Sequence, residues 1–198
     1  MPRPVRLVLP DIPHHVTQRG SRRQATFFSD ADYARYLALL RHWCGKAGTA
    51  VWAWCLMPNH VHLILVPTRE DGVAAALAPA QRRYSWEVNQ REGWSGALWQ
   101  GRYASFALDE PHLYACLRYI ELNPVRAQVV ERPEDWPWSS ARAHLGLAAD
   151  PIADLAPPAP ALTTGAPSSP PASTPPPTPP SAPPNAAAAS FDRCQVRA

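Results

Sequence analysis

An α+β domain followed by a disordered C-terminal tail is the fold class that this sequence predicts, and two observations lead to it. Short apolar segments of strand character alternate with segments whose apolar residues recur at helical spacing. All 8 Trp and all 6 Tyr lie within residues 1–149, whereas 14 of the 25 Pro lie between residues 151 and 184. Because aromatic side chains supply core area and a Pro/Ala/Ser-rich stretch does not, we expect one domain over residues 1–149 and a disordered tail over residues 150–198.

The first expected elements are two short strands and a helix. Residues 5–9 and 15–19 are partly apolar and predict strands, the second of which leads into a basic turn over residues 19–23. Ser29, with Asp32 three residues later, predicts a capped helix start, and apolar residues recur at helical spacing up to Cys44. Gly45 and Gly48 are expected to end this helix.

The central part of the sequence predicts a hairpin. Residues 49–56 and 60–66 are β-rich apolar runs, separated by the turn-forming triplet Met57-Pro58-Asn59. We therefore expect an antiparallel pair in the centre of the sheet.

The remaining elements complete the order of the fold. Residues 72–91 have a helical pattern that Pro79 is expected to break or restart, which leaves residues 81–90 as the firmer part. Residues 98–108 alternate as a strand does, and a last helix is expected over residues 112–123, ending before Pro124. The order β-α-β-β-α-β-α predicts a ferredoxin-like split βαβ antiparallel sheet with packed helices.

Composition argues against a CxxC-type thiol or metal protein and against a membrane-spanning protein. The formal net charge is only +3, and Lys46 is the only lysine. An arginine-rich surface suits phosphate recognition, but a GC-rich genome produces the same bias. The four Cys show no CxxC spacing, and no window of 18 apolar residues exists, so we expect a cytoplasmic protein with reduced thiols and no membrane association.

The candidate chemistry begins at His60-Val61-His62. Side chains alternate along a strand, so His60 and His62 point to the same face and both can offer a ring nitrogen to one metal ion, whereas Val61 enters the core. The alternative is that both are polar residues with structural partners at a strand start, and the spacing alone does not decide between them. His14 and His15 are placed in a loop and are given a structural role.

A second group lies on the last helix. Cys116, Tyr119 and Asn123 are spaced at i, i+3 and i+7, so a phenol and a carboxamide project from one face, a single turn apart. From spacing alone, Tyr119 is better interpreted as a core aromatic, and Asn123 as a residue at the end of a helix before Pro.

Four spaced motifs together resemble a known family. They are Met57-Pro58-Asn59-His60-Val61-His62-Leu63, Leu98-Trp99-Gln100-Gly101-Arg102, Arg118-Tyr119-Ile120-Glu121-Leu122-Asn123-Pro124-Val125-Arg126-Ala127 and Trp136-Pro137-Trp138-Ser139-Ser140. Their order, over about residues 6–146, resembles the single-tyrosine HUH transposases and specifically the REP-associated tyrosine transposases. The resemblance implies a ferredoxin-like domain that cleaves and rejoins single-stranded or hairpin DNA of the REP type.

The resemblance also implies roles for individual residues. His60 and His62 would hold a divalent metal, Mg²⁺ or Mn²⁺, and Tyr119 would attack the DNA to form a 5′-phosphotyrosine and a free 3′-OH. An ordinary tyrosine hydroxyl, with a pKa of about 10, is a weak nucleophile, so a metal that polarises the phosphate would assist it. Asn123 stands where many relatives have Gln, and its shorter side chain leaves open whether it binds the metal directly.

DNA contacts are expected from basic and polar residues near these motifs, although a solvated surface is the alternative for each arginine. Trp99 is the candidate for base stacking, whereas Trp136 and Trp138 are expected to pack. The full set of candidates is Arg19, Arg22, Arg23, Trp99, Gln100, Arg102, Arg118 and Arg126, with Arg82 and Arg83 on a helix as further possibilities.

Two other functions stay open at this point. A split βαβ sheet with aromatic and Arg residues is also typical of non-catalytic single-strand binding modules, which need neither His60 nor Tyr119. A metal-dependent nuclease that uses water would leave no protein–DNA adduct. The sequence leaves monomer and homodimer equally open.

Overall fold

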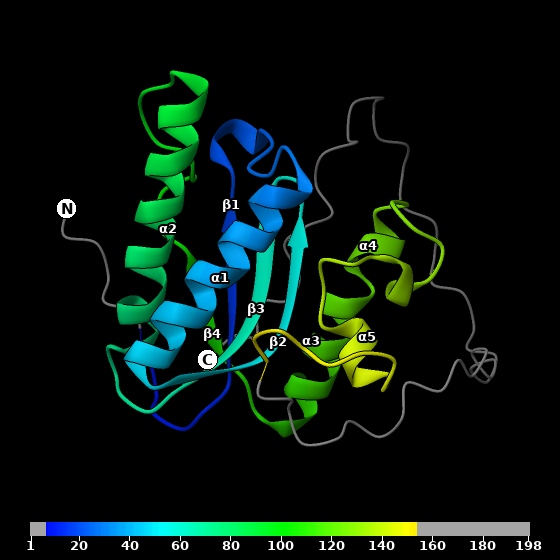
Figure 1. The fold of residues 1–198 in the computed structure, drawn as a ribbon. Helices are drawn as coiled ribbons and strands as arrows, with labels where there is room; N and C mark the ends of the chain where they lie inside the picture. The colour runs from blue at the N-terminus through cyan, green and yellow to red at the C-terminus, as the bar shows by residue number, and fades with distance from the viewer. Residues whose placement is uncertain (1–6, 154–198) are drawn as a thin grey trace, which may run out of the picture. The chain divides into compact units, whose positions relative to one another are not determined.

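A four-stranded antiparallel sheet forms the centre of the computed structural model, which describes residues 7–153 (Figure 1). Its strands are β1 (His14–Arg19), β2 (Thr49–Met57), β3 (His60–Pro67) and β4 (Ala104–Ala107). Their spatial order is β2-β3-β1-β4, and every neighbouring pair is antiparallel. This order confirms the predicted ferredoxin-like sheet and places β1 and β3 in its centre.

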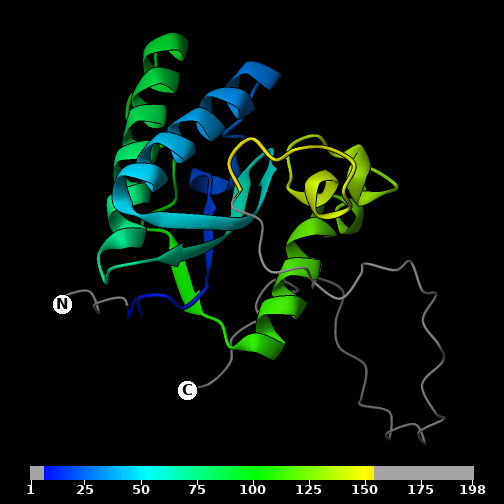
Figure 2. The same ribbon diagram turned by 60° about the horizontal axis from the view of Figure 1, so that its bottom comes forward.

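Helices cover both faces of the sheet. Helices α1 (Asp30–Ala47) and α2 (Gly72–Glu92) lie together on one face, and α3 (Glu110–Glu121) lies against β2 and β3 on the other (Figures 1 and 2). The short elements are η1 (Ser21–Arg23), α4 (Asn123–Arg126), η2 (Pro133–Asp135) and α5 (Ala141–His144). The sheet therefore has two separate apolar cores, one on each face.

The core between the sheet and the α1/α2 pair is aromatic and aliphatic. Val61, Leu63 and Leu65 alternate along β3 and are fully buried against this pair. Tyr84 on α2 is buried with them and donates a hydrogen bond from its hydroxyl to the carbonyl oxygen of Thr26 at 2.7 Å. This bond satisfies the polar end of a ring whose burial would otherwise be costly.

The start of α1 is as the sequence predicts, whereas only the second of the two glycines expected to end it does so. Ser29 and Asp32 form the expected capping box. Gly45 lies inside the helix, and Gly48 ends it in the left-handed conformation, with φ 63°.

The structure corrects the predicted bounds of α2 and α3. Helix α2 continues through Pro79 without a break, because the residues around it, Ala76, Leu77 and Ala80, are fully buried against the rest of the domain. Helix α3 ends at Glu121, before the expected limit, and α4 begins at Asn123 with Pro124 in its first turn, where a missing N–H costs nothing.

Two predicted strands are also corrected. Only Ala104–Ala107 pairs as a strand, whereas the segment from 98 to 103 forms a single bridge between Trp99 and Gly20. Residues 7–9 form no strand, and residues 5 and 6 lie outside the described part of the chain.

The segment after α4 returns to the sheet. Trp136 donates its indole N–H to the carbonyl oxygen of Leu56 at 3.1 Å, and the Trp138 ring stacks on Tyr33 with centroids 4.9 Å apart. The Asp150 carboxylate accepts the indole N–H of the buried Trp54 at 2.9 Å, and Ile152 packs on the core. The packed region thus includes residues 150–153, which the sequence assigned to the tail.

The rest of the predicted tail, residues 154–198, is outside the part of the chain that the structure describes. Its predicted disorder therefore stays a prediction. Cys44, Cys55 and Cys116 are buried reduced thiols, as expected, and Cys194 falls in the same undescribed segment. No helix within residues 7–153 is long and apolar enough to span a membrane.

Candidate active site and nucleic-acid interface

His60 and His62 lie on the face of strand β3 that is covered by α3. Val61 and Leu63 face the α1/α2 core, so the alternating positions His60 and His62 face the opposite side, where both are buried. Their ring centroids lie 5.0 Å apart. The strand pattern of the sequence therefore predicted this shared face correctly.

Tyr119 and Asn123 meet these histidines from the other side. The Tyr119 ring on α3 lies edge-on to His62, with centroids 5.5 Å apart, and is half-buried. Asn123, buried at the start of α4, places its Nδ2 3.5 Å from His62 Nε2. The structure thus brings together the predicted nucleophile and the three predicted metal ligands.

His15 also belongs to this cluster. It lies on β1 rather than in a loop, and its Nε2 is 3.1 Å from His62 Nδ1. The two imidazoles stack with centroids 5.3 Å apart and an interplanar angle of 14°. The antiparallel register pairs His15 with Ile64 and so makes it the diagonal neighbour of His62, a contact that the sequence analysis did not predict.

Asn59 is a second contact that sequence reasoning missed. Its Oδ1 lies 2.6 Å from His60 Nδ1, and its Nδ2 donates to the carbonyl oxygen of Arg23 at 3.1 Å. The sequence treated Asn59 as a turn residue only. Its position directly before His60 was the available signal, since a turn amide there can reach the neighbouring ring.

Burial keeps the three imidazoles neutral at pH 7. It lowers the pKa of His15 to about 4, and burial together with the nearby Arg19 charge lowers the pKa of His60 to about 4. The pKa of His62 is lowered well below its ordinary value, chiefly by burial. A neutral imidazole carries the lone pair that metal coordination requires.

The donor set fits a divalent cation. Within residues 7–153 no group of three or more His, Cys, Asp or Glu side chains is arranged to hold a metal ion. His60 and His62 would provide two imidazole nitrogens, and Asn123, whose Nδ2 faces His62 Nε2 in this structure, would provide its amide oxygen after a rotation of the amide. Mixed nitrogen and oxygen ligands of this kind suit Mn²⁺ or Mg²⁺.

Arginines surround the Tyr119 side of the cluster. The Arg126 guanidinium lies over the Tyr119 ring, 5.1 Å from its centroid. Arg19, half-buried at the end of β1, has a pKa lowered by burial and by Arg23, while its interaction with Tyr119 acts in the opposite direction. Positive charge therefore lies next to the Tyr119 side chain.

The other predicted DNA contacts border the same end of the sheet. Arg22 and Arg23 are exposed in the η1 turn, both with positive φ, and Gln100 and Arg102 are exposed on the segment that crosses beside it. The Gln100 backbone N–H donates to the Arg19 carbonyl oxygen at 2.8 Å, which ties the two segments together. Arg118 is exposed on α3.

Trp99 is an exception, and its predicted stacking role is wrong. It is only 6% exposed and packs among Phe27, Tyr36 and Tyr84 in the α1/α2 core. The bridge to Gly20 directs its side chain into this core instead of toward solvent.

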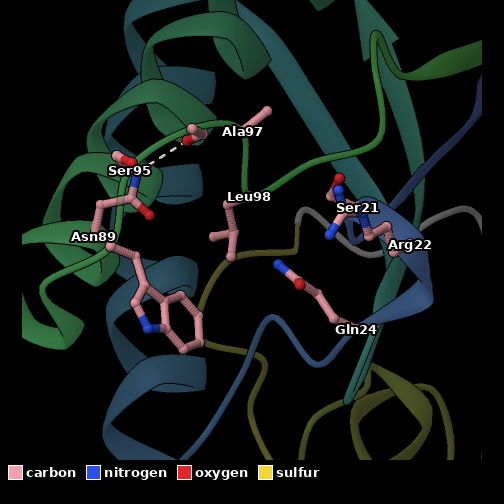
Figure 3. Close-up of a pocket in the computed structure, with 9 residues that line it drawn as sticks. Ser21, Arg22, Gln24, Asn89, Ser95, Ala97 and Leu98 are labelled. Carbon is pink, nitrogen blue, oxygen red and sulfur yellow. Dashed lines mark hydrogen bonds between the residues drawn. The ribbon is translucent and has the colours of Figure 1, made fainter.

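A hollow of about 340 Å³ lies beside the basic turn (Figure 3). Ser21, Arg22 and Gln24 line it from the η1 side, and Asn89 and Leu98 line it from α2 and the segment that follows. Its lining also includes Trp94, which is 45% exposed. Trp94, unlike Trp99, is therefore an exposed aromatic ring at this hollow.

A buried carboxylate holds α3 in place. Glu121, two residues after Tyr119, is 1% exposed and bonds to His144 Nδ1, and its Oε1 accepts from the Ser140 hydroxyl at 3.4 Å. The returning segment after α4 is thereby bound to the helix that carries Tyr119.

Comparisons with known proteins agree with this arrangement. The chain is 29% identical over 99 residues to a Haemophilus influenzae protein described as a REP-associated tyrosine transposase, covering 44% of this chain and 56% of that protein. It is 23% identical over 101 residues to the REP-associated tyrosine transposase of Escherichia coli K12, covering 50% and 59%. The chain therefore spans somewhat more than half the length of these curated relatives.

The fold is also similar to a solved structure, that of a REP-associated tyrosine transposase bound to a REP hairpin. The TM-score is 0.59 at 20% sequence identity, and the match covers 80% of this chain and 94% of that chain. The family described as transposase IS200 like matches residues 10–123, which contain β1, the two histidines, Tyr119 and Asn123. Because this match extends over more than half of the sequence, the chain belongs to the family of IS200-like transposases.

Proposed function

We propose that this protein cleaves and rejoins single-stranded DNA next to a hairpin, through a covalent bond between Tyr119 and a 5′ phosphate. One observation carries the proposal: His60 and His62 from a central strand, Tyr119 from α3 and Asn123 from α4 converge on one point. A binding module has no need of this convergence, because neutral buried imidazoles beside a phenol add nothing to phosphate affinity.

A divalent cation bound by His60, His62 and the Asn123 amide oxygen would polarise a non-bridging phosphate oxygen and neutralise charge in the transition state. The chain itself provides the nucleophile. The Tyr119 hydroxyl loses its proton to water, and its oxygen forms a bond to phosphorus. The bond from phosphorus to the 3′ oxygen breaks, and that oxygen takes a proton from water to give a 3′-OH. Arg19 interacts electrostatically with Tyr119, and its positive charge would offset negative charge that develops during the attack.

The covalent intermediate makes rejoining possible without a nucleotide cofactor. The phosphotyrosine bond retains the energy of the broken phosphodiester, so a 3′-OH attacks it and releases Tyr119. Because the buried Glu121 binds α3 to the segment after α4, α3 would hold Tyr119 in one position for both half-reactions.

The exposed arginines would hold the DNA. Arg22, Arg23 and Arg102 lie at the His60 end of the sheet, while Arg118 and Arg126 lie on the side of α3 and α4. Together they provide phosphate contacts on both sides of Tyr119. The similar structure of a REP-associated tyrosine transposase bound to a REP hairpin supports hairpin DNA as the substrate.

The test is the formation of a covalent protein–DNA adduct. The full chain is mixed with a single-stranded oligonucleotide that carries a hairpin, in the presence of Mn²⁺, and is then run on a denaturing gel. Wild type gives an SDS-resistant shifted band and a cleaved strand. Tyr119→Phe keeps the ring but lacks the attacking oxygen, so it gives neither. Tyr114→Phe on the same helix is the matched control and behaves as wild type.

The outcome separates the alternatives. A water-using nuclease would cleave the DNA without an adduct, and Tyr119→Phe would retain cleavage. A single-strand binding module would shift the DNA on a native gel and leave it intact. Either result refutes the proposal.

A further inference from the structure

We propose that His15 and Asn59 are positioning residues, which hold His62 and His60 as the tautomers that present both Nε2 atoms to one divalent cation. The inference deepens the proposed function, since it rests on His60 and His62 acting as metal ligands. It concerns contacts behind the ligands, on the Nδ1 side of each ring.

Asn59 defines the tautomer of His60. The Asn59 Nδ2 donates to the Arg23 carbonyl oxygen, so its Oδ1 is the atom that faces His60 Nδ1 at 2.6 Å. An amide oxygen can only accept a hydrogen bond, and His60 Nδ1 must therefore carry the proton. In the neutral ring His60 Nε2 then has the lone pair, although the hydrogen bond with Asn123, which raises the pKa of His60, acts against this tautomer.

Asn123 defines the tautomer of His62. Its Nδ2 lies 3.5 Å from His62 Nε2, and an amide nitrogen can only donate, so His62 Nε2 is the acceptor. The proton of His62 consequently resides on Nδ1. Asn123 would provide its amide oxygen to a cation at this point through a rotation of the amide.

His15 is the partner that this proton requires. Its Nε2 is 3.1 Å from His62 Nδ1 and accepts the Nδ1–H, while the stacked arrangement of the two rings fixes the orientation of His62. His15 comes from β1 and Asn59 from the turn before β3, so the two ligands are held from two different elements. A ligand histidine held through its second nitrogen binds metal more tightly, because its tautomer and direction are set in advance.

A first experiment measures the tautomers directly in the wild-type protein. Two-bond ¹H–¹⁵N correlation spectra of the metal-free ¹⁵N-labelled full chain at pH 7 distinguish protonated from unprotonated ring nitrogens. We expect His60 and His62 to be neutral with the proton on Nδ1. A proton on Nε2 of either ring overturns the proposal, and this measurement needs no variant.

A second experiment measures Mn²⁺ binding by calorimetry, without DNA. His15→Phe keeps a stacked ring but offers no acceptor, and we expect it to weaken Mn²⁺ binding by about 10–100-fold. His15→Gln places an amide oxygen near the position of His15 Nε2, so it should bind Mn²⁺ within about threefold of wild type. His42→Phe, an exposed His on α1, is the control for the substitution itself.

The outcomes are distinguishable from those of the proposed function. If His15→Phe binds Mn²⁺ as wild type does, or if His15→Gln loses as much as His15→Phe, then an acceptor at this position is not required and the proposal fails. Asn59→Leu should weaken binding to a similar degree as His15→Phe. If the tautomers and Mn²⁺ binding are as expected but no adduct forms with DNA, the proposed cleavage fails while the role of His15 and Asn59 stands.

Discussion

The two faces of the sheet are built from the same strands but have opposite chemistry. The face under α1 and α2 is lined by aliphatic and aromatic side chains, such as Val61 and Leu63, that are fully buried. The face under α3 combines a smaller apolar core with His15, His60 and His62. Burial alone therefore does not distinguish a structural from a functional face, because the histidines are almost as buried as the aliphatic residues.

What distinguishes them is how the polar atoms are used. On the α1/α2 face the Tyr84 hydroxyl donates its hydrogen bond to a backbone carbonyl oxygen, so its role there is structural. On the α3 face the rings of His62 and His15 are bonded to each other, and Asn123 supplies the contact to His62 Nε2. The polar side chains of the α3 face therefore contact one another, whereas that of Tyr84 contacts the backbone.

The largest effect should come from removing a ligand on the α3 face. We expect His60→Ala and His62→Ala each to reduce adduct formation at limiting Mn²⁺ by more than about 100-fold, beyond the loss that follows removal of an outer partner. EDTA should reproduce this loss with wild type. Circular dichroism should show that both variants are folded. If either variant formed as much adduct as wild type, the histidine that it lacks would not be a required metal ligand.

The neighbouring position on the other face should show the reverse behaviour. Leu63→Ala creates a cavity in the α1/α2 core and should reduce the free energy of unfolding by about 2–5 kcal/mol. Urea denaturation measures this loss. At temperatures where the variant is folded, its Mn²⁺ affinity should equal that of wild type, and a large drop in affinity would show that the two faces are not independent.

A smaller effect on stability concerns the start of α1. Burial raises the pKa of Asp32, but hydrogen bonds from Arg91 and from the Phe28 backbone outweigh it, and the net result is a pKa below 3.8. The ionised form therefore stabilises the fold above the unfolded-state value, and this contribution is lost as the pH falls through the lowered pKa. Asp32→Asn should cost about 1–2 kcal/mol at pH 7, as the loss of a helix cap does.

Melting curves at several pH values test this assignment. The difference in melting temperature between wild type and Asp32→Asn should be largest near pH 7 and should shrink as the pH falls below 3.8. Mn²⁺ affinity at pH 7 should not change. A constant difference at all pH values would mean that the charge of Asp32 contributes nothing.

Local patterns in the sequence were sufficient for part of the fold and of the site. Strand alternation places His60 and His62 on one face, and helical spacing places Tyr119 and Asn123 a turn apart, because both patterns depend only on neighbouring residues. The hairpin and the capped start of α1 were predictable for the same reason. The motif resemblance then linked the two local groups into one site, which their spacing alone did not do.

Contacts between distant strands were not predictable in this way. His15 joins the site through the register between β1 and β3, which no local pattern encodes. Trp99 was taken for a stacking residue because its motif lies near basic residues, yet the bridge to Gly20 directs it into the core. Pro79 is tolerated because the packing of α2 overrides a local propensity.

The smallest expected effect concerns two exposed arginines, one on each side of the sheet. Arg118 lies on α3 directly before Tyr119, whereas Arg35 on α1 forms a bidentate pair with Glu87 on α2. If the DNA follows the α3 face, Arg118→Ala should weaken hairpin binding by a similar factor for all sequences and lower the slope of log K against log salt by about 1. Arg35→Ala removes an exposed ion pair worth at most about 1 kcal/mol of stability and should leave DNA binding unchanged.

Fluorescence anisotropy at several salt concentrations measures both slopes. Because the two variants remove the same charge, an equal loss for both would mean that the protein binds DNA through its overall charge and not through the face that carries Tyr119.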